Sequence, residues 1–378
     1  MRRPDLRKRL EEMSAEQRAA LLKRIAAERK PVEKRWFDEP ICGLSEDAIK
    51  RMKEKEEDNC ISLGHAESKW LRYAKQLHSM RRLKVPAFFR ENVSPRELYK
   101  RLVAFCQAND LPEEIIFAVV PSLVNYIHTG MMTPIIFVGE KGCGKTTAVK
   151  LLMHEALGIP IEVVKVPGMA GGRGISGDNG SYKAADVGCV LKAQLKHNSL
   201  LVGFIFDEID KPERSRGENL NNQLLSLTDG SEEMIVDNFM ETRIIGLRHC
   251  PVFFTANDLG QVDPILADRC KIIHYPRATV QRLQSIARKY SVKRLEQETY
   301  QMIDFDRGLL EKSIDRLARR NVTSLRKYQR LIEIVLDSAF QEAMRHEEGY
   351  RPRTTAAMFE HAEREIFGEE RRRVGYNV

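Results

Sequence analysis

One short segment limits the possible folds of this chain more than any other. Residues 139–146 read Gly-Glu-Lys-Gly-Cys-Gly-Lys-Thr, which fits the pattern Gly-x4-Gly-Lys-[Ser/Thr] without a mismatch. An apolar run, residues 135–138, precedes the segment, and residues 148–153 predict a helix after it. In such a strand–loop–helix arrangement the glycines let backbone N–H groups point inward at phosphate oxygens, and the helix adds its positive end. The segment therefore predicts an α/β fold with a phosphate-binding loop, a P-loop, after one strand.

The residues of this loop are candidate contacts for ATP and Mg²⁺. Lys145 would reach the β- and γ-phosphates, and the hydroxyl of Thr146 would ligate Mg²⁺. Cys143 lies where the inward N–H groups and Lys145 should favour its thiolate, although a filler residue at a tolerant position is an equal alternative. The full set of predicted nucleotide-binding residues in the loop is Gly139, Glu140, Lys141, Gly142, Cys143, Gly144, Lys145, Thr146 and Thr147.

Two further polar positions follow apolar runs. Residues 201–206 run directly into Asp207 and Glu208, and a carboxylate pair at the end of a buried strand is costly unless it faces an ion or water. Asp207 would bind the metal through water, while Glu208 would orient and polarise the attacking water. An exposed strand end is the alternative. Asn257 ends a third apolar run, where its amide could hold the same water or the γ-phosphate, although Asn also commonly begins turns.

The spacing of the apolar runs predicts the fold class. Buried runs alternate with helical periods from residue 111 onward, which is typical of a parallel sheet with crossover helices on both faces. After residue 279 the strands stop and helical periods fill residues 280–346. We therefore expect an α/β P-loop NTPase sheet followed by an all-helical lid. The predicted strands are residues 135–138, 161–166, 201–206, 252–254 and 272–273.

The N-terminal part predicts helices. Ser14-x-x-Gln17 and Ser94-Pro-Arg-Glu97 are both helix start signals, and the charged residues 51–58 favour an exposed helix or a linker. A C-terminal helix is expected at residues 355–367. The predicted organisation is a mainly helical accessory domain (1–110), the nucleotide-binding domain (111–279), the lid (280–346) and a C-terminal helix with a basic tail (347–378).

Positive charge is concentrated at the N-terminus. Residues 1–100 contain 25 Lys and Arg against 17 Asp and Glu, whereas residues 101–378 contain 37 of each. A basic segment attached to a neutral body could contact nucleic acid or an acidic protein surface. Solvated helices of mixed charge are the alternative, and they are favoured because no recognition-helix pattern accompanies the charge.

Composition favours a cytoplasmic protein without a membrane span. The chain has 378 residues, 42% of them apolar, which is enough for about two or three domains with buried cores. Its seven cysteines are scattered and never form a Cys-x-x-Cys pair, which argues against disulfides and a structural zinc site. We expect no signal peptide, because the first residues are charged rather than apolar, and no run of 18 apolar residues occurs.

Together these motifs resemble the ATPase module of the Lon protease, within the AAA+ class, over about residues 133–340. The resemblance implies ATP hydrolysis in a homo-oligomeric ring, usually a hexamer. It also implies that Asn257 is a sensor residue and that Arg269 reaches the γ-phosphate bound to the neighbouring subunit. Taken alone, Arg269 would more often be a surface ion-pair residue. The segments that carry the resemblance are the P-loop, Asp207-Glu-Ile-Asp-Lys211, Phe254-Thr-Ala-Asn257 and Pro264-Ile-Leu-Ala-Asp-Arg269.

A further likeness concerns residues 181–188. They resemble the loop that places an aromatic residue in the central pore of the ring, where Tyr182 would grip an extended polypeptide. Glycines are frequent in residues 168–180, so the backbone before Tyr182 should be mobile. A flexible linker with an incidental tyrosine is the alternative.

The chain also departs from the family pattern. The sensor arginine of the lid aligns with Thr323, and Arg326 lies three residues further on, so either Arg326 substitutes as a nucleotide contact or lid sensing is weakened. No counterpart of the adenine-binding motif stands before the P-loop, which leaves residues 111–130 as the expected region. The peptidase domain of the family has no counterpart here, so we expect no peptide cleavage by this chain.

Three functions remain to be compared. The first is a ring ATPase that remodels or translocates a protein client, with the basic N-terminal domain choosing the client or partner. The second is an ATP-controlled assembly or switch that binds nucleic acid through the same domain. A small-molecule kinase is the third, and it is disfavoured because kinases do not need the arrangement of Asn257 and Arg269.

Overall fold

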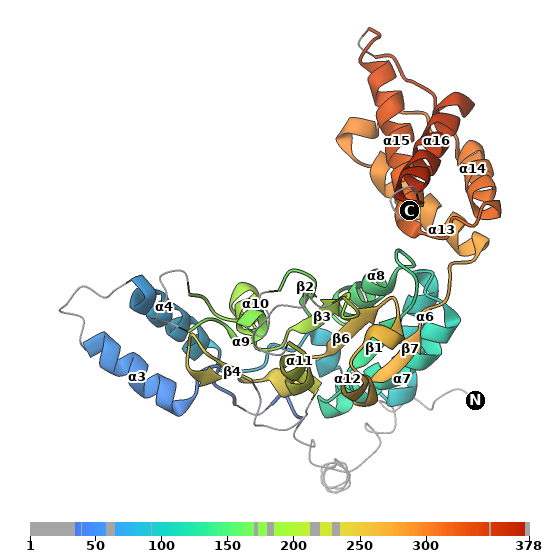
Figure 1. The fold of residues 1–378 in the computed structure, drawn as a ribbon. Helices are drawn as coiled ribbons and strands as arrows, with labels where there is room; N and C mark the ends of the chain where they lie inside the picture. Colours follow the sequence, from blue (N-terminus) through green and yellow to red (C-terminus); the bar gives the residue numbers. More distant parts are fainter. Residues whose placement is uncertain are drawn as a thin grey trace, which may run out of the picture.

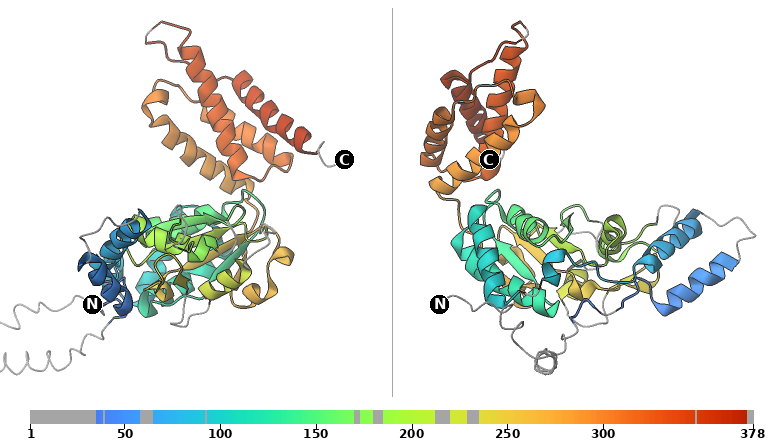
Figure 2. Two further views of the ribbon diagram at one scale, coloured as in Figure 1. Left: turned by 60° about the vertical axis from the view of Figure 1, so that its left-hand side comes forward. Right: turned by 180° about the vertical axis from the view of Figure 1, so that it is seen from behind.

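The computed structural model describes residues 35–38, 40–57, 65–91, 93–169, 173–179, 185–211, 220–228, 235–347 and 349–374. A five-stranded sheet with flanking helices forms the centre of the molecule (Figure 1). Helices α3 and α4 lie at one end of this α/β body. A separate group of helices, the lid, stands over α6 and α8 at the other end, as the two further views also show (Figure 2).

All five strands of the sheet are parallel, in the order β2-β3-β6-β1-β7. Every residue of β1 and of β6 is buried, as expected for strands covered on both faces. The five strands predicted from the sequence and the α/β fold class are therefore confirmed. Because the strands are parallel, their carboxyl ends meet at one edge of the sheet. The strands are β1 (Ile135–Val138), β2 (Ile161–Lys165), β3 (Gly203–Asp207), β6 (Val252–Ala256) and β7 (Lys271–His274).

Helices connect the strands and continue into the lid. The helices of the α/β body are α3 (Glu46–Glu57), α4 (His65–Ser79), α5 (Ala87–Arg90), α6 (Pro95–Ala108), α7 (Glu113–Thr129), α8 (Lys145–Lys150) with a π-helical continuation (Leu151–Ala156), α9 (Arg173–Ser176), α10 (Cys189–His197), α11 (Leu220–Thr228) and α12 (Pro264–Asp268). The lid helices are α13 (Val280–Leu295), α14 (Arg307–Arg319), α15 (Leu325–Ala343) and α16 (Ala356–Val374).

The start of α6 shows how local sequence sets a helix boundary. The hydroxyl of Ser94 accepts a hydrogen bond from the backbone N–H of Glu97 at 3.3 Å, and Pro95 is the first helical residue. Leu98 and Leu102 follow on the buried face. The helix start predicted at Ser94 is confirmed, whereas the signal at residues 14–17 lies outside the described residues.

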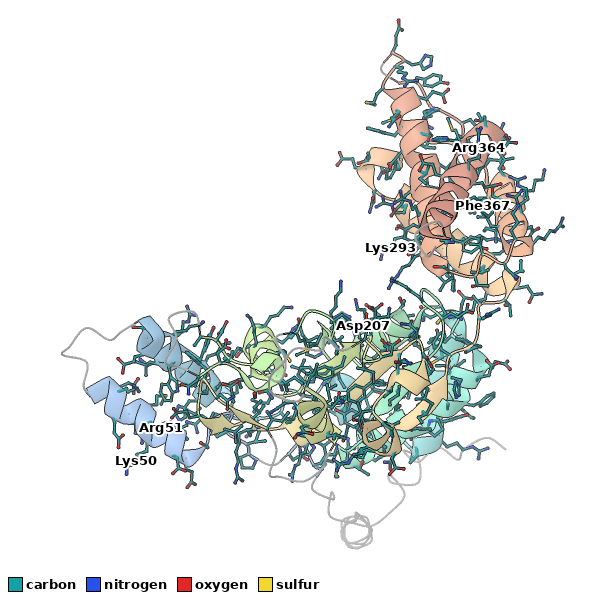
Figure 3. The ribbon with its side chains drawn as sticks, in the orientation of Figure 1. Lys50, Arg51, Asp207, Lys293, Arg364 and Phe367 are labelled. Carbon is teal, nitrogen blue, oxygen red and sulfur yellow. The ribbon has the colours of Figure 1, made fainter. Side chains whose placement is uncertain are left out.

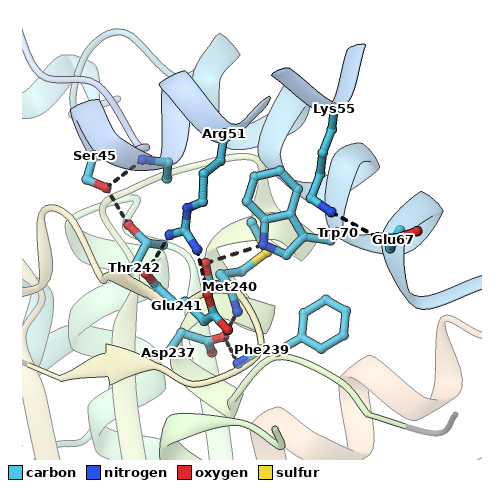
Figure 4. A network of polar contacts seen from close by, with 11 residues as sticks. Ser45, Arg51, Lys55, Glu67, Trp70, Asp237, Phe239, Met240, Glu241 and Thr242 are labelled. Carbon is cyan, nitrogen blue, oxygen red and sulfur yellow. Dashed lines mark hydrogen bonds and ion pairs between the residues drawn. The ribbon is translucent and has the colours of Figure 1, made fainter. Parts of the chain in front are cut away.

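The N-terminal helices dock on a short hairpin, β4 (Val236–Asp237) and β5 (Thr242–Arg243), which the sequence analysis missed (Figure 4). Arg51 of α3 binds the carboxylate of Glu241 at 2.5 Å and its carbonyl oxygen at 2.8 Å. Trp70 of α4 donates its indole N–H to the carbonyl of Met240 at 3.3 Å. The charged segment predicted as an exposed helix or linker is thus a helix with one buried face, which carries Ala48 and Met52.

Two apolar cores stabilise the chain. The first runs from Phe37 to Tyr275 and therefore includes side chains of α4 together with the sheet. The second runs from Ala278 to Ile366 within the lid helices. Helix α16, predicted as part of a separate C-terminal segment, is longer than expected and packs on α14 and α15. The domain boundaries drawn from the sequence stay predictions. None of the helices in the described part of the chain combines the length and apolar character needed to cross a membrane.

Candidate nucleotide-binding site

A cavity of about 260 Å³ opens at the carboxyl ends of β1, β3 and β6, beneath the lid. Asp207 lies at this edge of the sheet, facing the lid (Figure 3). The cavity brings together the P-loop, the strand ends and the first and third lid helices. Its lining comprises Lys141, Gly142, Gly144, Lys145, Thr146, Thr147, Ala148 and Leu151 after β1; Asp207, Glu208, Thr255 and Asn257 at the strand ends; Asn109, Asp110, Leu111 and Tyr275; and Arg282, Ile286, Lys289, Leu325, Arg326 and Gln329 of the lid.

The oxygen atoms of three side chains meet at the ends of β3 and β6. Thr146 donates its hydroxyl to Oδ1 of Asp207 at 3.0 Å, and Thr255 donates to the same oxygen at 2.6 Å. The hydroxyl of Thr255 also accepts the backbone N–H of Glu208 at 3.1 Å. Thr146 and Asp207 were predicted from the sequence, whereas Thr255, which lies within the Phe254–Asn257 segment and fixes the end of β3, was not.

The donor chemistry of Thr146 and Asp207 fits Mg²⁺. Both groups offer oxygen, the ligand atom that this hard cation prefers, and Mg²⁺ is usually held by one or two carboxylates together with substrate phosphates and water. Within the described residues, no group of three or more His, Cys, Asp or Glu side chains is placed to hold a metal ion. A site that is completed by phosphate oxygens agrees with this donor set.

Lys145 is almost enclosed, with 7% of its surface exposed. Its ammonium donates to the carbonyl oxygens of Gly139 at 2.5 Å and Glu140 at 3.0 Å, and to Oδ1 of Asn257 at 3.3 Å. Burial lowers the pKa of Lys145, while the surrounding carboxylates, Asp207 first among them, oppose this shift. The structure therefore places the predicted P-loop lysine against the predicted sensor amide.

The glycines of the P-loop permit a close approach of the lid. Gly142 has a φ of +82°, and its carbonyl oxygen accepts the backbone N–H of Leu325 at 3.0 Å. A Cβ atom at Gly142 would lie 2.3 Å from the hydroxyl oxygen of Ser324. Gly144 has a φ of +106°, which an L residue rarely adopts. Only glycine suits the contact between the loop and α15.

Cys143 does not meet the expectation of a reactive thiolate. Its side chain is 3% exposed, and it does not line the cavity. Burial raises the pKa of the Cys143 thiol, and this effect exceeds the opposing influence of Lys145. The prediction of a thiolate is therefore wrong, because the side chain turns into the protein body while the backbone forms the loop.

Glu208 occupies a strained backbone conformation with a φ of +60°. Its carboxylate lies 3.9 Å from the ammonium of Lys141 and 3.8 Å from that of Lys211. The side chain also lines the cavity, next to Asp207. The predicted catalytic carboxylate thus faces the site and is held there between two cations.

The lid meets the P-loop through Glu140. The carboxylate of Glu140 pairs with Arg277 and accepts the hydroxyl of Thr323 at 3.3 Å. Arg326 lines the cavity, whereas Thr323 does not. Of the two residues considered for the sensor position, the structure brings Arg326 to the cavity and Thr323 to the outer side of the loop.

The opposite end of the cavity is built by residues that the sequence analysis did not identify. Arg282 donates to the hydroxyl of Tyr275 and to the carbonyl of Asp110, both at 2.8 Å, and its guanidinium lies 5.4 Å from the centre of the Tyr275 ring. The carboxylate of Asp110 in turn accepts Ser285 at 2.9 Å and Lys289 at 2.5 Å. Of the region 111–130, only Leu111 lines the cavity. No local sequence pattern marked these residues.

Two predicted residues lie elsewhere. Arg269 is the C-cap residue after α12, is exposed, and donates to the carbonyl of Leu225 at 3.4 Å. It does not line the cavity, because Lys271, two residues later, pairs with Ile135 at the opposite end of β1 from the P-loop. Tyr182 lies outside the described residues.

Comparisons with known proteins agree with this geometry. Residues 135–277 match the family "ATPase family associated with various cellular activities (AAA)". A Lon protease homolog of Acanthamoeba polyphaga mimivirus is 30% identical over 161 residues, which are 42% of this chain and 16% of that protein. The Lon protease of Flavobacterium johnsoniae is 27% identical over 236 residues, which are 61% of this chain and 28% of that protein. The chain thus corresponds to a minor part of the length of these relatives.

A solved structure supports the fold. The closed-state cryo-EM reconstruction of Hsp104 with ATPγS and FITC casein has a TM-score of 0.54 and 16% sequence identity, over 74% of this chain and 53% of that chain. At this identity the likeness concerns the fold alone. Residues 135–277 therefore match the AAA family of ATPases, and the chain resembles a part of the Lon proteases.

Proposed function

We propose that this chain binds ATP with Mg²⁺ in the cavity beneath the lid, hydrolyses it at the interfaces of a ring, and uses the energy to remodel or translocate a protein client. One observation carries the ATPase part of the proposal. Thr146 and Lys145 of the P-loop are hydrogen-bonded to Asp207 of β3 and Asn257 after β6, inside a single cavity. A P-loop, a strand-end acid and a strand-end amide are the parts that phosphoryl transfer to water requires.

ATP binding would use the two ends of the cavity differently. The P-loop backbone would cradle the phosphates, with Lys145 and Arg326 supplying positive charge. The opposite end, where Leu111, Tyr275 and Ile286 line the cavity, offers the apolar surface that an adenine ring prefers. Because both ends include lid residues, bound nucleotide would hold the lid against the α/β body.

Hydrolysis would depend on Glu208 and Asn257. Glu208 would orient the attacking water and accept its proton, and its place beside Asp207 on the cavity wall supports this role. Asn257 would position the same water or the γ-phosphate. Mg²⁺, held by Thr146 and Asp207, would supply charge that offsets the negative phosphate oxygens.

Assembly into a ring would complete the site with Arg269 from a neighbouring chain. Arg269 is exposed and lies at the end of β7 away from its own P-loop, a position that supports this role. An arginine that acts within the same chain would have to line the same cavity. A charge supplied across an interface stabilises the transition state only when the neighbour is present.

Client handling would use Tyr182, in the segment 181–188 that resembles a pore loop. Contacts of Asp178 and Asp186, which are described residues on either side of Tyr182, support the proposal that the two ends of this segment are held together. The N–H of Asp178 donates to the carbonyl of Asp186 at 3.0 Å, and the carboxylate of Asp186 binds Lys69 at 3.0 Å and Tyr73 at 3.2 Å, both from α4. Force on the loop would therefore reach α4 as well as the sheet.

The concentration of positive charge in residues 1–100 favours one second candidate, an ATP-controlled switch that binds nucleic acid. A stimulation assay separates the two candidates. ATP hydrolysis is measured alone, with an unfolded protein, and with single- and double-stranded DNA or RNA, using Glu208→Gln protein as the control for contaminating ATPases. The proposed function predicts stimulation by the unfolded protein. Stimulation by nucleic acid alone would favour the second candidate.

A further inference from the structure

Asp210 directs both of its hydrogen bonds at one residue. Its Oδ2 atom accepts the backbone N–H of Asn257 at 3.1 Å and the side-chain Nδ2 of Asn257 at 3.2 Å. Its other oxygen, Oδ1, is buried and has no hydrogen-bond partner among the described residues. A carboxylate kept in such a place is costly, so its contribution should be sought in what it does to Asn257.

The two groups that contact the side-chain amide of Asn257 require different atoms of it: one requires the nitrogen and the other the oxygen. A carboxylate accepts hydrogen bonds only, so the amide nitrogen must face Asp210. An ammonium donates only, so the amide oxygen must face Lys145, whose Nζ lies 3.3 Å from Oδ1. A flipped amide would place its oxygen against the carboxylate of Asp210 and its N–H groups against the ammonium of Lys145. Asp210 and Lys145 together therefore fix the amide in one orientation.

We infer that Asp210 is the positioning residue for Asn257: it sets which end of the amide faces the phosphates. The inference rests on the proposed function, in which Asn257 acts on the water or the γ-phosphate. Asp210 itself does not line the cavity, so its hydrogen bonds act on the reaction through Asn257, while its charge also raises the pKa of Lys145. The hydrogen bonds of Asp210 also tie Asn257, which follows β6, to the segment after β3.

The consequence is a defect in turnover rather than in binding. Without the carboxylate the amide can rotate, and the contact between Asn257 and Lys145 is no longer enforced. We expect Asp210→Ala to lower kcat by about 10- to 100-fold, the range expected for losing one charge-assisted hydrogen bond. ATP affinity should change by less than about threefold, because the P-loop contacts stay in place.

A double-mutant cycle tests whether Asp210 acts through Asn257. Phosphate release and binding of a fluorescent ATP analogue are measured for Asp210→Ala, Asn257→Ala and the double variant, with thermal unfolding as the check on folding. The double variant should be no slower than Asn257→Ala alone. Asp210→Asn should retain more activity than Asp210→Ala, because an amide oxygen at this position still accepts both N–H groups. If the alanine variant does not fold, Asp210→Leu, of similar size, replaces it in the cycle.

Several results would overturn the inference. These are a wild-type kcat for the folded Asp210→Ala or Asp210→Leu protein, a double variant whose defect is the product of the two single defects, or full activity of Asn257→Ala. The first two leave the proposed function intact as long as Glu208→Gln protein is inactive, and the third removes from it only the role of Asn257. If Glu208→Gln hydrolyses ATP at the wild-type rate, the proposed function itself fails, whatever the Asp210 variants do.

Discussion

Thr146 and Asp207 share a hydrogen bond of 3.0 Å that joins the first turn of α8 to the end of β3. In the proposed function this pair would supply oxygen ligands to Mg²⁺, so loss of the hydroxyl should weaken ATP binding only when the metal is present. We predict that Thr146→Ala lowers ATP affinity about 10-fold in Mg²⁺ and leaves it nearly unchanged in excess chelator. Thr146→Ser, which keeps the hydroxyl, is the matched control. An equal loss of affinity with and without Mg²⁺ would contradict the assignment.

Gly142 allows the P-loop to touch the lid. An alanine there would combine the strain of a φ of +82° with a Cβ atom 2.3 Å from the Ser324 hydroxyl oxygen. We predict that Gly142→Ala destabilises the protein by more than about 1–3 kcal/mol, the range for backbone strain alone, and weakens ATP binding. Gly168→Ala is the control, because Gly168 has a φ of +104° and no atom of the described residues lies within 4 Å of the added Cβ.

A second change tests the clash directly. Ser324→Gly removes the side chain that the new methyl group would meet, so it should recover part of the lost stability in the Gly142→Ala protein. Chemical unfolding of the four proteins, wild type, two single variants and the double variant, gives the coupling between the sites. Strictly additive effects would show that Gly142 and Ser324 are not in contact.

Apolar patterning and local capping predicted most of the fold. Buried runs such as residues 135–138 identify parallel strands because strands covered on both faces must be apolar throughout, and Ser94 marks a helix start because its contacts are local. The β4–β5 hairpin was missed, since each strand has only two residues and the hairpin depends on partners such as Arg51 and Trp70, distant in sequence. The sequence of the hairpin alone therefore does not predict it.

The candidate nucleotide site could be predicted from the sequence only where all the residues involved lie within one short motif. The P-loop and the Asp207–Glu208 pair stand out in the sequence, whereas the contact of Asp110 with Arg282 joins residues that are 172 positions apart in the chain. The protonation state of Cys143 could not be predicted from its motif. Its place in a phosphate-binding loop suggested a thiolate, but the burial of its side chain, which decides its pKa, is a property of packing.

Asp237 should make stability depend on pH. Its carboxylate is fully buried and accepts the N–H groups of Gly188 at 2.8 Å, Phe239 at 3.1 Å and Met240 at 2.9 Å. Burial raises the pKa of Asp237 from 3.8 to about 6, although these backbone hydrogen bonds oppose the shift. Between these two pH values the folded protein binds more protons than the unfolded chain, so stability falls as pH rises through the window.

The measurement compares wild type with Asp237→Asn, in which this position does not titrate. We predict that the stability of wild type relative to the variant decreases by about 2 kcal/mol from pH 4 to pH 6 and by less than about 0.5 kcal/mol more up to pH 8. Other groups titrate in both proteins, so their effects cancel. Urea unfolding across this range provides the values, and a relative stability that rises with pH would contradict the assignment.

Arg269 should act across an interface. We predict that Arg269→Ala protein binds ATP normally but hydrolyses it about 10³- to 10⁵-fold more slowly. Mixing it with Glu208→Gln protein should restore activity, because some interfaces then combine an intact Glu208 with an intact Arg269. The mixture is assayed over a range of ratios, with mixed assembly confirmed by differently tagged subunits. Background activity at every ratio would exclude a shared site.

The most direct test of the account separates ATP binding from ATP hydrolysis at this one cavity. Lys145→Ala removes a phosphate contact, whereas Glu208→Gln removes only the group that activates water. Binding and turnover of labelled ATP are measured for both proteins and for wild type. The account predicts no detectable binding by Lys145→Ala, and near-normal binding with turnover reduced about 10²- to 10⁴-fold for Glu208→Gln. Hydrolysis by Glu208→Gln at the wild-type rate would contradict it.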